Sequence, residues 1–196
     1  DVLLGPTINL QRTPLAGRNF ECYSEDPHLT AELAIAYTHG VQGGDVAVCL
    51  KHFACNDSEF QRQSISSVVD ARTLREIYLR PFERAIREAG AWTVMSAYNR
   101  LNGEYCSANR WLLTEILREQ WGFDGVVISD WGGTYDTVGP AVAGLDLEMP
   151  GPPRRMGEAL VAAVRAGGVD EASLDEKVRR QLRLMARTGR LDDPEH

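Results

Sequence analysis

The stretch DGVVISDWGG, residues 124–133, decides the fold that we expect for this chain. Its apolar run VVI, residues 126–128, is bounded by a glycine and a serine, which is typical of a short strand buried on both faces of a parallel sheet. Asp130 follows this strand, at the carboxyl end where parallel α/β folds bind their ligands. The pattern therefore predicts a functional carboxylate at a sheet edge.

The residues after the strand suggest what this carboxylate meets. Trp131 offers a broad apolar face, and the two glycines that follow allow the backbone to turn sharply. A carboxylate beside an indole suits a sugar ring, whose C–H face stacks on the aromatic while its anomeric carbon and hydroxyls meet polar groups. The alternative is that Asp130 caps a helix and Trp131 belongs to the core.

On both sides of this stretch the chain repeats the order strand, polar loop, helix. Besides residues 126–128, the expected strands are 2–4, 46–50, 92–97 and 144–149. Strands that alternate with helices predict an α/β fold with a parallel sheet. About five such units are present, whereas a complete (β/α)8 barrel takes about 250 residues. We expect an open doubly wound sheet or an incomplete TIM-like barrel without its first strands, and the start at Asp1 favours the barrel.

Composition and charge narrow the possible partners. The 196 residues are 43% hydrophobic and 25% charged, which is ordinary for a globular protein. A net charge of -7 argues against nucleic acid and anionic membranes. No apolar run approaches the roughly 18 residues that cross a bilayer. Four irregularly spaced cysteines favour reduced thiols in the cytoplasm, although the start of the chain leaves a signal peptide open.

Polar side chains gather at the strand ends and in the loops that follow them. In a parallel fold these loops open on one face, so residues far apart in sequence can meet there. Cations and an aromatic around one carboxylate make sense for glycoside hydrolysis, which needs an ionised carboxylate, an acid and donors for sugar hydroxyls. No His, Cys and carboxylate group has metal-ligand spacing, so we predict neither a metal nor a cofactor. The candidate residues around Asp130 are Arg18, Glu21, Lys51, His52, Arg62, Tyr98, Trp131 and Glu148.

Each candidate also has a purely structural interpretation. Lys51 and His52 could be solvated residues at a strand end. Arg18 could pair with Glu21 on the surface, and Tyr98 could be a packed aromatic. Glu148 is better interpreted as a residue that fixes a loop, because Met-Pro follows it.

Five motifs give the chain a resemblance to a known enzyme family. They are GRNFECYSEDP at 17–27, KHFACND at 51–57, VMSAYNRLNGEYCSAN at 94–109, WGFDGVVISDWGG at 121–133 and GLDLEMPG at 144–151. In this order, and over nearly the whole chain, they resemble glycoside hydrolase family 3 in its bacterial β-glucosidase branch. The resemblance implies that residues 1–196 are the C-terminal portion of the family's N-terminal (β/α)8 barrel domain.

The resemblance also implies an activity and roles for particular residues. The expected reaction is the retaining hydrolysis of terminal, non-reducing β-D-glucosyl residues from small β-glucosides or oligosaccharides. Asp130 corresponds to the catalytic nucleophile, and Trp131 to a residue that lines the sugar subsite. The residues that would bind the glucosyl unit are Arg18, Lys51, His52, Arg62 and Tyr98.

The chain also departs from the family pattern. An aspartate that binds substrate from an early barrel loop has no counterpart here. In the β-glucosidase branch the general acid/base is a glutamate on a following α/β sandwich domain, and the tail at 173–194 resembles the end of the barrel domain. KHFACNDSE does not match the KHFPGHG-like motif of the single-domain N-acetylhexosaminidases. We therefore expect the sandwich domain of the same protein as a partner, and no activity without it.

Two further functions remain open at this stage. Lys51 could form a Schiff base in an aldolase-like barrel. The site could also be a sugar-binding module without catalysis. The residue pattern alone, without the resemblance, predicts only a carboxylate-centred site on a parallel α/β fold.

Overall fold

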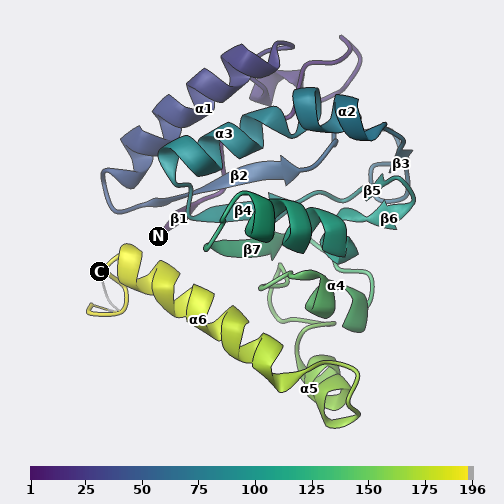
Figure 1. The fold of residues 1–196 in the computed structure, drawn as a ribbon, viewed down its shortest axis with the longest axis vertical. Coiled ribbons are helices and arrows are strands. Elements are labelled where there is room, and N and C mark those ends of the chain that lie inside the picture. The colour runs from purple at the N-terminus through teal and green to yellow at the C-terminus, as the bar shows by residue number, and fades with distance from the viewer. Residues whose placement is uncertain (194–196) are drawn as a thin grey trace.

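The computed structural model describes residues 1–193 and contains a four-stranded parallel sheet (Figure 1). The strands lie in the order β1-β2-β4-β7. This confirms the predicted α/β class with a parallel sheet, and the sheet does not close into a barrel. Strand β2 extends three residues beyond the expected end and includes Lys51 and His52. The strands are β1 (Val2–Leu3), β2 (Ala47–Phe53), β4 (Thr93–Ser96) and β7 (Val126–Ser129).

Helices cover the sheet, with α1 and α3 packed side by side on one face (Figure 1). The last helix, α6, lies apart from that pair and contacts β7. The α-helices are α1 (Pro27–Gln42), α2 (Ala71–Thr73), α3 (Arg80–Ala89), α4 (Val138–Ala143), α5 (Glu158–Arg165) and α6 (Glu171–Arg187). The 3-10 and π segments are η1 (Asn19–Glu21), η2 (Leu74–Tyr78), η3 (Cys106–Ala108) and η4 (Trp111–Gln120).

The central strands are buried on both faces, as the apolar run in β7 predicts. Val127 belongs to the main core beneath the helices, whereas its neighbours Val126 and Ile128 belong to a smaller cluster on the opposite face. Leu184 of α6 packs against that smaller cluster. Because successive side chains of a strand point to opposite faces, a wholly apolar strand needs a cover on each side.

A small second sheet extends from the main one and carries the loops near the strand ends. It consists of β3 (Ser66–Ser67), β5 (Arg100–Leu101) and β6 (Glu104–Tyr105). Asn102 and Gly103 connect β5 to β6 with φ of 50° and 95°. Positive φ at both positions is what a tight hairpin turn requires, and Asn-Gly is the pair of residues that adopts it most readily.

The strand expected at 144–149 is reduced to a single bridge between Leu147 and Ile128. The reason lies in Asp146, whose carboxylate accepts a hydrogen bond from the backbone N–H of Val127 at 2.8 Å. A side-chain oxygen thus takes a position that a backbone carbonyl would fill in a regular ladder. The prediction of a fifth regular strand was wrong for this reason.

The helical region after Asp70 is divided into three parts, α2, η2 and α3. Asp70 does cap it, because its carboxylate accepts from the N–H groups of Arg72 and Thr73. A π segment, η2, then interrupts the α-helical pattern. A proline inside a helical pattern usually kinks the helix, but Pro81 stands at the start of α3, where a missing N–H costs nothing.

A buried carboxylate fastens α6 to the sheet. The side chain of Asp146 is completely buried, and it pairs with Arg118 of η4 at 2.7 Å and with Arg180 of α6 at 2.9 Å. Lys177, also in α6, donates to the carbonyl of Leu145 at 2.8 Å. Burial lowers the pKa of Lys177 to about 8. Because a buried charge is costly without partners, these contacts fix the helix against β7.

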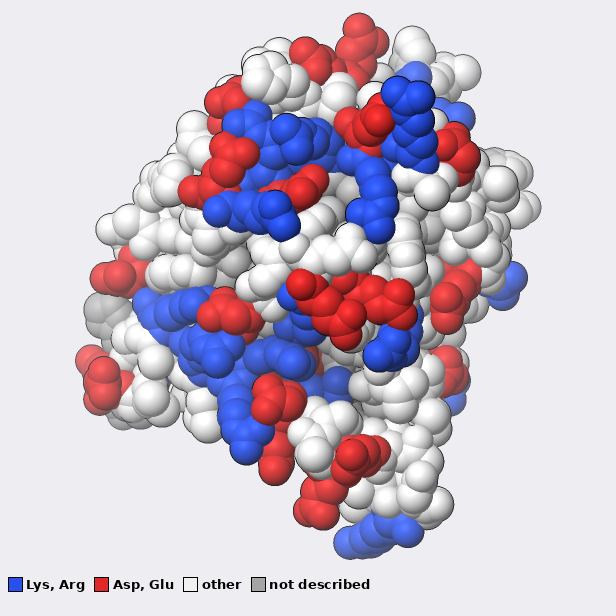
Figure 2. Space-filling view, in the orientation of Figure 1, with Lys and Arg blue, Asp and Glu red and all other residues white. Residues whose placement is uncertain are grey.

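The surface mixes both signs of charge. Figure 2 shows lysine and arginine side chains interleaved with aspartate and glutamate on one face of the described residues. Arg84, for example, pairs with both Glu32 and Glu88. None of the described helices combines the length and the apolar character needed to cross a membrane. All four cysteines are free thiols.

Gly125 provides a test of the packing between β4 and β7. A Cβ atom at this position would lie 2.1 Å from the carbonyl oxygen of Trp92 and 2.7 Å from the ring of Phe123. We predict that Gly125→Ala lowers the free energy of unfolding by roughly 2–4 kcal/mol, since backbone must move to relieve the clash. Urea denaturation of both proteins measures the change.

Gly40 supplies the control for that measurement. It lies within α1, and a Cβ atom there would meet nothing within 4 Å. Gly40→Ala should raise stability by about 0.5–1 kcal/mol, because alanine favours the helix. Equal effects of the two substitutions would contradict the packing described for Gly125.

The long loop 6–27 is held to the loop after β2 through a buried carboxylate. Asp57 is 9% exposed, and its carboxylate accepts from the N–H of Leu10 at 3.2 Å. Burial raises the pKa of Asp57 to about 6, against the opposing effects of the Leu10 bond and of Arg12. Because the unfolded carboxyl loses its proton first, stability falls as pH rises from about 4 to about 6.

We predict that Asp57→Asn stabilises the chain at pH 8 and leaves it unchanged at pH 4. The amide keeps an oxygen for Leu10 but carries no charge to bury, so the gain should be roughly 1–3 kcal/mol. Melting curves at the two pH values measure it. Asp70→Asn is the control: Asp70 is exposed, and its pKa is lowered by hydrogen bonds from Thr73, so no gain at pH 8 is expected. A gain of equal size at pH 4 would contradict the titration of Asp57.

Candidate functional site

The carboxyl ends of β2, β4 and β7 lie level with one another. Ser96 of β4 pairs with Phe53 on one side and with Ser129 on the other. The register between β2 and β4 shifts between Leu50 and Phe53, so Lys51 and His52 lie in an irregular part of the strand. Such irregularities redirect side chains at strand ends. The parallel pairing thus brings three polar segments to one edge of the sheet.

Asp130 lies at the centre of this edge. It is 7% exposed, and its N–H donates to the carbonyl of Ser96 at 3.3 Å. Its Oδ1 accepts from the N–H of Trp131 at 2.7 Å, whereas its Oδ2 is buried and has no hydrogen-bond partner among the described residues. Asp130 caps no helix, since the next one begins at Val138, and Trp131 is 40% exposed. The structural alternative for this pair of residues was therefore wrong.

His52 is buried against Asp130, which excludes the solvated interpretation for this residue. It is 2% exposed, and its Nε2 lies 3.5 Å from Oδ2 of Asp130. Burial lowers the pKa of His52 to about 3, and the charges of Arg18 and Lys51 act in the same direction. The imidazole is therefore neutral at neutral pH, and its contact with Asp130 is not an ion pair.

Arg18 connects the first loop to this histidine. Its Nη1 lies 3.2 Å from Nε2 of His52, and its Nε and Nη2 each donate to Glu21 at 2.8 Å. The bond from Arg18 lowers the pKa of Glu21 to about 2, and Thr7 donates to the same carboxylate. The predicted pair with Glu21 thus exists, and it holds the guanidinium against the site.

Tyr98 and Arg62 form the other wall. Tyr98 is 5% exposed, and its hydroxyl donates to the carbonyl of Trp131 at 2.9 Å. Burial and then the charge of Asp130 raise the pKa of Tyr98 to about 12, so the hydroxyl keeps its proton. Arg62 lies over the Tyr98 ring at 4.8 Å and pairs with Glu59 at 2.7 Å. Tyr98 is therefore both a packed aromatic and part of the site.

Lys51 is half-buried beside His52. Its backbone bonds to the first loop, because its N–H donates to the carbonyl of Pro6 and its carbonyl accepts from the N–H of Ile8. Its charge acts on both Glu21 and His52. The structure thus brings Arg18, Lys51, His52, Arg62, Tyr98 and Trp131 around Asp130.

Glu148 has a different place. Its Oε2 accepts from the N–H groups of Arg155 and Met156 at 2.8 and 2.7 Å. It fixes the loop after the bridge at Leu147, as the sequence suggests.

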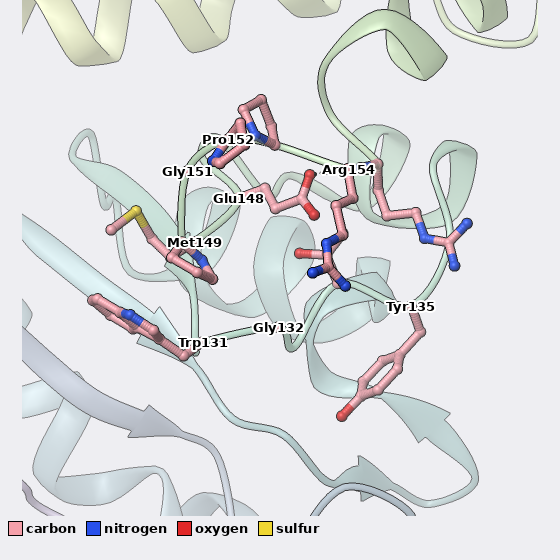
Figure 3. A pocket seen from close by; sticks show the side chains of 12 residues that line it. Trp131, Gly132, Tyr135, Glu148, Met149, Gly151, Pro152 and Arg154 are labelled. Atoms are coloured by element: carbon pink, nitrogen blue, oxygen red, sulfur yellow. Dashed lines mark hydrogen bonds between the residues drawn. The ribbon is translucent and has the colours of Figure 1, made fainter.

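The residues of this loop line a pocket of about 560 Å³ beside Trp131. Figure 3 shows the pocket between the loop 148–155 and the segment 131–135, with Trp131, Tyr135, Glu148 and Arg154 around it. Asp130 is not among its lining residues. Trp131 therefore stands at the border between the carboxylate site and this pocket, whose size is typical of small-molecule sites.

Three supporting residues were missed by the sequence analysis. Asn9 bonds to both backbone and ring of His52. Ser107 donates to the carbonyl of Gly133, and Tyr135 donates to the carbonyl of Tyr98. Asn9 gave at most the weak signal of a polar residue in the loop after the expected strand 2–4. The others act across loops whose contacts no local pattern reveals.

The arrangement is suited to nucleophilic chemistry by a carboxylate. One buried oxygen of Asp130 has no hydrogen-bond partner within residues 1–193, and it faces a neutral histidine and a nearby guanidinium. Within residues 1–193, no group of three or more His, Cys, Asp or Glu is arranged to hold a metal ion.

Comparison with known proteins agrees with these features. A β-glucosidase of Rhizobium radiobacter is 60% identical over 188 residues, which cover 96% of this chain and 23% of that protein. Thermostable β-glucosidase B of Acetivibrio thermocellus is 51% identical over 184 residues, covering 94% of this chain and 24% of that protein. The chain therefore spans about a quarter of the length of these curated relatives.

The solved structures give the same result. β-Glucosidase 3B of Thermotoga neapolitana in complex with glucose superposes with a TM-score of 0.93 and 46% identity, over 97% of this chain and 28% of that one. The β-glucosidase of Bifidobacterium adolescentis superposes with a TM-score of 0.93 and 43% identity, over 98% of this chain and 28% of that one. The sequence profile of the glycosyl hydrolase family 3 N-terminal domain matches residues 1–184, so the chain belongs to this family.

Proposed function

We propose that this chain carries the nucleophile and part of the sugar-binding site of a retaining β-glucosidase. The observation that carries the proposal is the unpartnered Oδ2 of the buried Asp130, surrounded by donors that suit sugar hydroxyls. The names of the relatives and the glucose bound to the Thermotoga neapolitana protein favour a β-glucoside as substrate. Arg18, Lys51 and Arg62 would donate to the sugar hydroxyls, and Trp131 would stack on the ring.

The proposed reaction has two displacement steps. Oδ2 of Asp130 attacks the anomeric carbon, a C–O ester bond forms, and the bond to the leaving-group oxygen breaks as that oxygen takes a proton from a general acid. Water then attacks the same carbon and gives a proton to the resulting base. The ester bond breaks, Asp130 regains its negative charge, and glucose leaves with its original configuration.

We infer that the general acid lies on another domain of the longer protein. Glu21 is the carboxylate bound to Arg18, and a pKa of about 2 makes it a poor proton donor at neutral pH. Glu59 is engaged with Arg62, and Glu148 with two backbone N–H groups. The expected sandwich domain would place its glutamate opposite Asp130, and the chain alone would then hydrolyse ordinary glucosides very slowly.

Trapping of the glycosyl-enzyme tests the role of Asp130. A 2-deoxy-2-fluoro-glucoside with an activated leaving group needs little acid assistance and yields a long-lived ester. The protein to be labelled is a chimaera in which this chain replaces the matching 188 residues of the Rhizobium radiobacter relative. We predict a single adduct on Asp130, which intact-mass analysis and peptide mapping would locate. The isolated chain should label at the same residue if its site is preformed.

Two substitutions separate the nucleophile from the loop carboxylate. Asp130→Asn should remove the adduct and lower kcat of the chimaera by roughly 10⁴-fold or more, as loss of a nucleophile does. Glu148→Gln should keep the adduct and kcat within about tenfold, because an amide oxygen in the place of Oε2 can still accept both backbone bonds. An adduct on another residue, or none in an active chimaera, would refute the assignment.

A further inference from the structure

The environment of Asn9 carries an inference beyond the proposed reaction. Asn9 is 4% exposed and lies where the first loop runs alongside β2. Its Nδ2 donates to the carbonyl of His52 at 2.9 Å, and its Oδ1 accepts from the N–H of His52 at 2.8 Å. The amide thus continues the backbone ladder that Ile8 and Lys51 form just before it.

These two bonds determine the orientation of the amide. A flipped side chain would set its NH₂ group against the N–H of His52 and its oxygen against the carbonyl, and both bonds would be lost. Oδ1 must therefore be the atom that lies 3.1 Å from Nδ1 of the same histidine. Since an amide oxygen only accepts, Nδ1 carries the ring proton.

Arg18 leads to the same result from the other side of the ring. Its Nη1, which only donates, lies 3.2 Å from Nε2 of His52. Nε2 must then present a lone pair. Two independent contacts therefore require the same neutral tautomer, with the proton on Nδ1.

The tautomer has a consequence for Asp130. Nε2 lies 3.5 Å from Oδ2 of Asp130, and two acceptors at this distance form no hydrogen bond. This accounts for the buried Oδ2 without a partner. The opposite tautomer would donate a hydrogen bond from Nε2–H to Oδ2 and so lower the nucleophilicity of that oxygen, and Nε2 would have no lone pair for Arg18.

We propose that Asn9 is a positioning residue that holds His52 as the Nδ1–H tautomer, so that Nε2 binds Arg18 and Oδ2 of Asp130 stays free. The tautomer rests on the contacts alone, whereas its value for catalysis rests on the proposed glycosidase function. The charged groups around the ring are Arg18 and Glu21 from the first loop, Lys51 from β2, Arg62 from the next loop and Asp130 at the end of β7.

Nitrogen NMR of the histidine rings tests the proposal directly. In the chain labelled with ¹⁵N-histidine at pH 7, long-range ¹H–¹⁵N correlations distinguish a protonated from an unprotonated ring nitrogen, and His52→Gln identifies the signals of His52. We expect a protonated Nδ1 and an unprotonated Nε2. A protonated Nε2, or an even mixture of tautomers, would overturn the proposal without any variant of Asn9.

Two isosteric substitutions show whether Asn9 is the cause. Asn9→Asp places a negative charge 3.1 Å from Nδ1, so we expect His52 to become doubly protonated at pH 7. Asn109→Asp is the control, because Asn109 is also buried but accepts from Leu112 at a helix start, and His52 should keep its tautomer. If Asn9→Asp does not fold, Asn9→Ala serves instead and should give mixed tautomers. An unchanged His52 signal in a folded Asn9 variant would refute the role of Asn9.

The rate of labelling by the fluoro-glucoside completes the test. A charged hydrogen bond from His52 onto Oδ2 should slow labelling of the Asn9→Asp chimaera roughly ten- to a hundred-fold, while Asn109→Asp labels at the wild-type rate. Unchanged labelling with a doubly protonated His52 would refute the effect on Asp130. If no protein is labelled but the NMR signals are as expected, the glycosidase function is refuted and the assignment of the His52 tautomer is still supported.

Discussion

The parallel register of β2, β4 and β7 is the constraint on which the site depends. Because Phe53, Ser96 and Ser129 pair in one row, the chain leaves all three strands at the same level. A different side chain lies at the end of each strand: His52 at the end of β2, Tyr98 after β4 and Asp130 after β7. A shift of one residue in either pairing would turn these side chains to the opposite faces of the sheet.

Buried charges fix the elements that keep this register. Asp146 is completely buried, yet it binds Arg118, Arg180 and the N–H of Val127, and so joins η4 and α6 to β7. Removal of one partner would leave an uncompensated charge in the core, which is far more costly than the net stability that the network contributes. The network thus acts mainly to specify one arrangement of helix and sheet, immediately behind the strand that carries Asp130.

The pairing of donors and acceptors also determines which groups of the site are available to a ligand. Arg18 binds Glu21 and His52, and the hydroxyl of Tyr98 donates to the carbonyl of Trp131, so these two donors near Asp130 are engaged with other acceptors. Oδ2 of Asp130 is one of the buried oxygens that have no hydrogen-bond partner in the described part of the chain. An oxygen held in this state keeps its lone pairs available for a ligand, since no hydrogen bond must be broken first.

Local sequence patterns were enough to predict the α/β class, the buried strand before Asp130 and the set of polar residues at the strand ends, because periodicity and residue type are local properties. The interruption of the strand at 144–149 by Asp146, the start of a helix at Pro81 and the neutral state of His52 became visible in the folded chain. The tertiary structure also revealed Asn9, whose role comes from a partner 43 residues away. Burial, tautomer and ion pairing depend on contacts between distant segments, and a local sequence pattern does not predict such contacts.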